Sequence, residues 1–89
     1  KQALAEAEAF EQLGSLYLLT GNYYRAEKSL SNALEIKEST LEPNVPHLIP
    51  AILELARLSL LNGNYGPADQ YLNRASAIAL ETFGNKSLH

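Results

Sequence analysis

Apolar and small residues recur at the spacing of an α-helix along most of this chain. Four of them stand at positions i, i+3, i+4 and i+7 near the N-terminus and form one stripe of a helix: Phe10, Leu13, Gly14 and Tyr17. Gly21 follows, and glycine readily adopts the left-handed backbone conformation that ends helices. The pattern therefore predicts a first helix over residues 2–20.

Asn22 begins a second helical pattern, because an asparagine side chain can accept hydrogen bonds from the free N–H groups at a helix start. This helix is expected over residues 23–41. Its stripe consists of Ala26, Leu30 and Ala33, followed by Ile36 or the aliphatic stem of Lys37. Two helices joined by so short a turn must lie antiparallel, which predicts a helical hairpin.

Two prolines, Pro43 and Pro46, then interrupt the pattern, because proline does not fit inside a regular helix. Asn44 is a candidate cap for a third helix, expected over residues 46–62. Pro50 falls early in this helix and is expected to loosen its first turn. The stripe of the third helix is Ile52, Leu55, Ala56 and Ser59.

Gly63 ends the third helix in the way that Gly21 ends the first. Asn64 is expected to cap a fourth helix over residues 65–82, and Gly84 is its expected stop. Pro67 stands in the first turn, where its missing N–H removes no hydrogen bond. The fourth stripe is Ala68, Leu72, Ala75 and Ile78.

The second half of the chain repeats the first at a distance of 42 residues. About fourteen matched positions are identical without a gap, against roughly four expected for random pairs of this composition. One hairpin cannot bury its apolar stripe alone, so repeated hairpins are expected to stack. We predict an all-α fold in one domain, residues 1–89, with repeat 1 over about 2–42, repeat 2 over about 44–84 and a tail at 85–89.

These positions resemble the tetratricopeptide repeat, in which a bulky residue, Leu-Gly, Tyr, Gly-x-Tyr, Ala, a large apolar residue and Ala follow at this spacing. The first copy carries them as Phe10, Leu13-Gly14, Tyr17, Gly21-Asn22-Tyr23, Ala26, Leu30 and Ala33. The second copy departs at Ser59, where an aromatic residue is usual, and otherwise matches through Ile52, Leu55-Ala56, Gly63-Asn64-Tyr65, Ala68, Leu72 and Ala75. The 42-residue period exceeds the common period of about 34 and looks like the longer variety of kinesin light chains and many bacterial arrays. The resemblance implies an α-solenoid with a right-handed superhelical stack.

Composition excludes several classes of partner. The net charge of −3 lacks the basic surface that nucleic-acid binding requires. No apolar run is long enough to span a membrane. The chain has no cysteine, which excludes disulfides and fits a cytoplasmic location without excluding secretion. It begins without methionine, and we expect it to be a piece of a longer protein.

The sequence contains no pattern that indicates an enzyme, a cofactor site or a metal site. His47 and His89 stand 42 residues apart and are read either as ligands or as equivalent positions between repeats. Neither has acidic residues and a second histidine at ligand spacing. Serine-hydrolase and phosphate-loop motifs are missing as well. We therefore predict no catalytic residue, no cofactor and no metal ligand.

The resemblance implies that the first helix of each hairpin lines a concave surface. Opposite the stripes, the first helix presents Glu8, Glu11, Gln12, Ser15, Leu18 and Leu19, and the third presents Pro50, Leu53, Glu54, Arg57, Leu60 and Leu61. The family's carboxylate clamp, which grips acidic peptide ends, needs Lys, Asn and Arg at such positions. Glu11, Ser15 and Glu54 do not match it. The candidate partner-binding residues are Glu8, Glu11, Gln12, Ser15, Leu19, Leu53, Glu54, Arg57 and Leu61.

We predict a scaffold module that binds an apolar or basic-amphipathic segment of a partner protein in an acidic, leucine-lined groove. One alternative is that the leucines only seal the helix pair or a neighbouring repeat. Another is a structural spacer that associates with itself by end-to-end stacking or helix exchange, with residues 43–46 as hinge. A third is the sensor arm of a larger signalling protease or transcription regulator.

The remaining charges are expected to form a solvated convex face, because they nearly cancel: Arg25, Glu27, Lys28, Glu35, Lys37 and Glu38. Glu54 and Arg57 stand three residues apart and are expected to pair for a few tenths of a kcal/mol.

Overall fold

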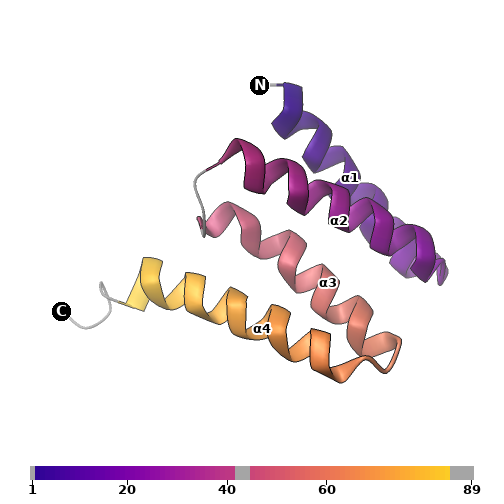
Figure 1. Cartoon of the computed structure of the whole chain (residues 1–89). Coiled ribbons are helices and arrows are strands. Elements are labelled where there is room, and N and C mark those ends of the chain that lie inside the picture. The colour runs from indigo at the N-terminus through magenta and orange to yellow at the C-terminus, as the bar shows by residue number, and fades with distance from the viewer. Residues whose placement is uncertain (1, 42–44, 85–89) are drawn as a thin grey trace.

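Four α-helices lie side by side in chain order in the computed structural model, which describes residues 2–41 and 45–84 (Figure 1). They are α1 (Gln2–Thr20), α2 (Tyr23–Thr40), α3 (Ile49–Leu61) and α4 (Tyr65–Ala79). The molecule measures 44 × 34 × 18 Å and is a flat stack of two antiparallel hairpins. The described residues contain no β-strand, and the prediction of an all-α fold is confirmed.

The turn between α1 and α2 is built as its sequence predicts. Gly21 has a φ of +81°, and its N–H donates to the Leu18 carbonyl at 3.2 Å. The N–H of Asn22 donates to the Tyr17 carbonyl at 2.9 Å, so two free carbonyls at the helix end are satisfied. The Asn22 side chain accepts from the N–H of Arg25 at 3.4 Å, which confirms its role as a cap.

The turn between α3 and α4 repeats this backbone pattern 42 residues later. Gly63 has a φ of +78° and donates to Leu60 at 3.1 Å, and Asn64 donates to Ser59 at 2.8 Å. Asn64 is the N-cap residue of α4, as predicted, but its side chain makes no capping hydrogen bond. Its backbone carbonyl accepts from Ala68 at 3.2 Å instead, so the helix start rests on the main chain.

Replacing Gly21 or Gly63 with alanine should lower the free energy of unfolding by about 1–2 kcal/mol each, the cost of a left-handed conformation for a residue with a Cβ. An added Cβ meets no atom within 4 Å at either position, so the cost is purely conformational. Gly66→Ala is the matched control. Gly66 also has open space but lies in α4 without a positive φ, so alanine there meets no left-handed penalty. Its helix propensity is opposed only by the following Pro67, and the net change should be small. Urea denaturation measures all three; equal effects at Gly21 and Gly66 would contradict this account.

The third helix begins later than predicted. Residues Pro46–Leu48 form a tighter 3₁₀ turn, η1, and the α-helix starts at Ile49. Pro50 explains the difference, because its ring lacks an N–H and would clash with the carbonyl four residues earlier in a regular α-helix. Pro50 was expected to loosen the first turn; the turn is altered, but it is tightened into a 3₁₀ turn. The predictions made for Pro43, for Asn44 as a cap and for the tail at 85–89 lie outside the described residues.

Helical structure at the other end extends to Gly84, as expected, but in a different form. After Ala79 the backbone widens into a π-helical segment, η2 (Leu80–Gly84). The fourth helix therefore reaches its predicted length, although its last turn has a wider hydrogen-bonding pattern than an α-helix.

The core lies at the junction of the two hairpins. It joins Leu18, Leu30 and Leu34 of the first hairpin to Leu48, Ile52, Leu55 and Leu58 of the second. Gly14 allows α1 and α2 to approach closely, since a Cβ on it would stand only 2.5 Å from Leu30 Cγ. A small residue at this crossing thus permits close packing of the two helices.

Two predicted positions on α1 are exchanged. Leu13 was expected on the buried stripe but is exposed, and Leu18 was expected on the concave side but belongs to the core. The buried residues of α1 are Ala7, Gly14 and Leu18, which face α2 and the second hairpin. Leu13 lies on the edge of α1 that no described helix covers. The turn tyrosines differ too: Tyr23 packs against the core, whereas Tyr65 is exposed.

Candidate partner-binding groove

The first helices of the two hairpins, α1 and α3, border a groove. Its central cavity has a volume of about 340 Å³ and is lined by Glu11, Gln12, Ser15, Pro50, Leu53, Glu54 and Arg57. A second cavity of about 480 Å³ adds Glu8, Lys37, Pro46 and His47, and a third of about 190 Å³ adds Leu18, Leu19 and Leu61. The cavities share lining residues and form one continuous depression. All nine candidate partner-binding residues lie in it.

Helical spacing explains why these residues meet. Glu8, Ser15 and Leu19 stand seven and four residues apart on α1, so they share one face with the pair at positions 11 and 12. On α3 the groove residues recur with the same spacing, through Leu53 and Arg57 to the end of the helix. Because α1 and α3 lie on the same side of the stack, the two faces oppose each other across the groove.

Glu54 lies at the centre of the groove with only part of its hydrogen-bonding capacity used. The hydroxyl of Ser15 donates to Glu54 Oε2 at 3.1 Å and ties α1 to α3. The other oxygen, Oε1, is buried and accepts no hydrogen bond. Its nearest cation is the Arg57 Nε at 3.8 Å, an exposed i, i+3 neighbour. The predicted pair is confirmed. It leaves one carboxylate oxygen of Glu54 without a hydrogen bond, although 28% of the side chain is exposed to the groove.

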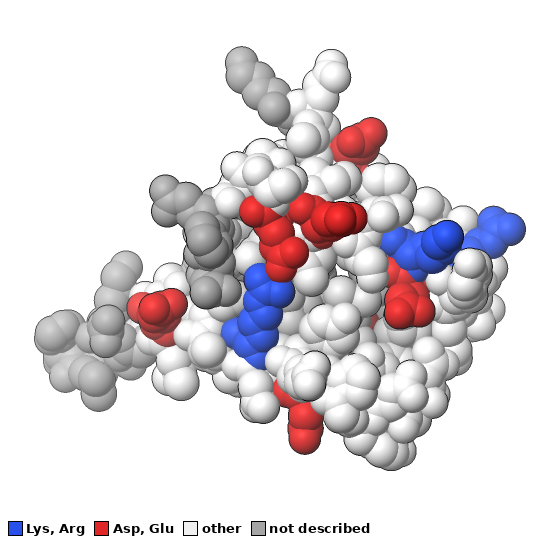
Figure 2. Space-filling view, in the orientation of Figure 1, with Lys and Arg blue, Asp and Glu red and all other residues white. Residues whose placement is uncertain are grey.

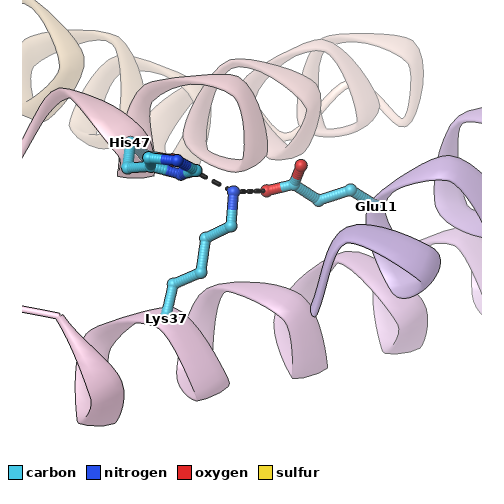
Figure 3. A network of polar contacts seen from close by, with 3 residues as sticks. All are labelled: Glu11, Lys37 and His47. Atoms are coloured by element: carbon cyan, nitrogen blue, oxygen red, sulfur yellow. Dashed lines mark hydrogen bonds and ion pairs between the residues drawn. The ribbon is translucent and has the colours of Figure 1, made fainter. Parts of the chain in front are cut away.

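The sequence predicts two environments for Lys37: its stem on the apolar stripe and its charge on the solvated convex face. In the structure the Lys37 side chain is buried, and its polar contacts are drawn in Figure 3. Only 2% of its side chain is exposed. Its Nζ lies 2.6 Å from Glu11 Oε2 in an ion pair and donates to the His47 carbonyl at 3.1 Å. The expectation of a solvated Lys37 is wrong, while that of its stem on the helical stripe is confirmed. The stripe Ala26, Leu30, Ala33 continues to position 37 and was the available signal.

The ion pair joins three segments of the chain. Figure 3 shows Lys37 rising from α2 between Glu11 of α1 and the start of the second hairpin at His47. The Lys37 Nζ is the charge that balances Glu11, because it lies 2.6 Å from Glu11 Oε2, at the distance of a charge-assisted contact. Glu11 therefore lines the groove with a charge that the protein already balances, unlike the charge of Glu54.

The apolar part of the groove lies toward the hairpin turns. Leu19 and Leu61 both line the third cavity, and 83% and 52% of their respective surfaces are exposed. Leu53 is also exposed, in the central cavity. These three leucines do not seal the helix pair; Leu18 does. Residues 58–68 contain no charged side chain. Figure 2 shows a broad uncharged area at the turn between α3 and α4.

The other charges lie mainly in solvent. Figure 2 shows acidic groups scattered over the face in view rather than gathered in one patch. Arg25, Glu27, Lys28 and Glu35 are exposed, as the solvated-face interpretation predicts. Lys28 lies over the ring of Tyr24, with its Nζ 5.5 Å from the ring centre. Glu38 pairs with Arg74 of α4 at 2.7 Å and links the second helices of the two hairpins.

Within residues 2–41 and 45–84 no three acidic or histidine side chains gather as metal ligands would. His47 contributes its backbone carbonyl to Lys37, and its side chain lies beside the second cavity of the groove. His89, its counterpart in the repeat, lies outside the described residues. None of the described helices has the length and apolar character needed to cross a membrane.

Comparison with known proteins gives one finding. A family model described as "Tetratricopeptide repeat" matches residues 5–81, which includes both copies of the repeat. No curated protein and no solved structure matches the chain.

Proposed function

The chain belongs to the tetratricopeptide repeat family, and we propose that its groove between α1 and α3 binds a segment of a partner protein. Proteins of this family generally act as non-catalytic modules for protein–protein interaction. The segment that fits this groove is a peptide or helix that carries apolar side chains and one basic side chain. The incompletely paired carboxylate of Glu54 in the centre of the groove is the observation that carries this choice.

The basic side chain has a specific place in the groove. A lysine or arginine from the partner donates to the Glu54 carboxylate, which is 28% exposed and has one oxygen that accepts no hydrogen bond within the chain. The site is partly shielded from water, so a charge-assisted hydrogen bond is stronger there than on an open surface. Glu11 is already paired with Lys37 and contributes less to the preference.

The apolar side chains fit the end of the groove near the turns. Leu19 and Leu61 lose exposed surface when a partner side chain covers them, and burial of apolar area favours binding by about 25 cal/mol per Å². The arrangement predicts a segment whose basic residue lies over Glu54 and whose apolar residues lie over the two leucines.

Selection of short random peptides on the immobilised chain tests this proposal. We expect the selected peptides to combine Leu, Ile or Phe with Lys or Arg. Their binding to a Glu54→Lys variant should fall roughly tenfold or more, since a like charge replaces the attractive one. Asp69→Lys makes the same charge change at an exposed position of α4, away from the groove, and should leave affinity nearly unchanged.

A second arm of the experiment removes the apolar contacts. A Leu19→Ser/Leu61→Ser double variant should keep its helix content and melting temperature, because both side chains are largely exposed. It should bind the selected peptides more weakly. Melting of the fold, or full affinity in both the leucine and the Glu54 variants, would refute the groove as the binding site.

A further inference from the structure

Two leucines of α1 are exposed although their counterparts in the second repeat are buried. Leu13 is 39% exposed and Leu55 only 2%. Leu16 is 54% exposed and Leu58 only 3%. Leu55 and Leu58 are covered because α3 packs on the first hairpin at the core junction. The surface of Leu13 and Leu16, here called the leading face, is therefore the one that α3 uses for stacking.

The opposite difference appears at the other end of the stack. Leu18 is 8% exposed and its counterpart Leu60 is 47% exposed. Leu30 is fully buried, whereas Leu72 is 39% exposed. Leu18 and Leu30 are covered because the second hairpin packs on them. The surface of Leu60 and Leu72, here called the trailing face, is the one on which a following hairpin would stack.

We propose that a second copy of this chain docks its leading face on the trailing face of the first. The internal junction indicates that the docking partner is a second copy. The two surfaces that meet at this junction are the repeat counterparts of the trailing face and the leading face. The second copy would take the register that the second hairpin takes on the first. Such a contact joins two different surfaces, so it leaves a free face at each end and permits longer head-to-tail assemblies. It does not use the groove residues Leu19 and Leu61.

The contact between copies is weaker than the internal junction. Glu6 stands on α1 where the buried Leu48 stands in the second repeat, and Ser76 stands on α4 where Leu34 stands in the first. Both exchanges place polar groups at the edge of the interface, and burial of polar groups opposes docking. The assembly is therefore reversible and depends on concentration. Replacing Glu6 with leucine should strengthen it.

Sedimentation velocity on the full chain tests the proposal over about 10 μM to about 1 mM, where weak association is populated. The mean mass of the unaltered chain should rise with concentration. Leu16→Glu blocks the leading face and Leu60→Glu the trailing face, and each alone should reduce association roughly tenfold or more. An equal mixture of the two variants should form dimers but nothing larger, because each variant keeps one intact face.

Leu19→Glu is the control, since it adds the same charge at an exposed leucine outside both faces. It should associate like the unaltered chain. Circular dichroism establishes that each variant keeps its helix content. A monomer at every concentration, or a mixture that stays monomeric, would overturn the proposal. Association of Leu16→Glu or of Leu60→Glu alone that is as strong as in the unaltered chain would also overturn it, because it would indicate that like faces pair.

Discussion

Replacing Leu30 with alanine should lower the free energy of unfolding by about 3–5 kcal/mol, the upper part of the range for a buried leucine. Leu30 has no exposed surface and lies where α1 and α2 meet at the hairpin junction. Gly14 and the second hairpin hold the surrounding backbone, so the site cannot collapse around the missing side chain. Urea denaturation followed by circular dichroism measures the loss.

Leu72→Ala is the matched control, because Leu72 occupies the same position in the second repeat and is partly exposed. Leu72→Ala should lower the free energy of unfolding by about 1–2 kcal/mol, since Leu72 removes less apolar area from water on folding. Leu30→Met keeps most of the volume and should cost less than about 1.5 kcal/mol. Equal losses for the two alanine variants would contradict the unequal burial of the two repeats.

A double-mutant cycle with Gly14 sharpens this prediction. In the unaltered chain, Gly14→Ala should be destabilising, because the new Cβ would lie 2.5 Å from Leu30 Cγ and 2.7 Å from its Cδ2. With alanine at position 30 those atoms are gone. Gly14→Ala should then stabilise the chain by about 0.5–1 kcal/mol through helix propensity. The change of sign separates a steric contact from a general effect on α1.

The sequence predicts the order of helices and both turns because their signals are local. Gly21 and Gly63 act through backbone conformation, which neighbouring residues scarcely alter. The 42-residue period then predicts stacking, since two copies with the same apolar stripe need the same neighbour. The groove residues also follow from helical spacing alone, and the structure brings all nine together.

What the sequence could not show depends on contacts between distant segments. Leu13 and Leu55 are identical in type and pattern, and only the presence of a hairpin beside α3 buries the second. Asn22 and Asn64 likewise occupy the same position in two turns of the same kind, yet only the Asn22 side chain accepts the capping hydrogen bond. Periodicity within one helix assigns a residue to a face, and it does not say which faces find a partner.

Lys37 is the plainest case, because its environment is made by residues far along the chain. Its helical position indicates burial, whereas its charge indicates solvent. The balance is decided by Glu11 from α1 and the His47 carbonyl, which no local pattern brings together. The environment of Glu54 also depends on a distant segment, since Ser15 of the other hairpin donates a hydrogen bond to it.

Replacing Glu11 with glutamine should lower the free energy of unfolding by about 3–5 kcal/mol, the cost of leaving a buried charge without its partner. The Lys37 ammonium would keep the His47 carbonyl and a neutral amide oxygen at position 11, but it would have no opposite charge in its buried position. Lys37→Met should cost about 1 kcal/mol, because methionine fills the apolar path and Glu11, partly exposed, can be solvated. The double variant should lie close to Lys37→Met, which denaturation at constant pH and salt would measure.

Variants of the Glu11–Lys37 pair and of Glu54 distinguish effects on stability from effects on peptide recognition. Because Lys37 balances Glu11, neutralising both residues together should leave the peptide preference for a basic side chain largely in place. Glu54→Gln should remove that preference with little loss of stability, because Glu54 is balanced only by an exposed arginine at 3.8 Å. If the double variant lost the basic preference and Glu54→Gln kept it, Glu11 would be the recognition charge. Lys37 would then be a competitor that a partner must displace.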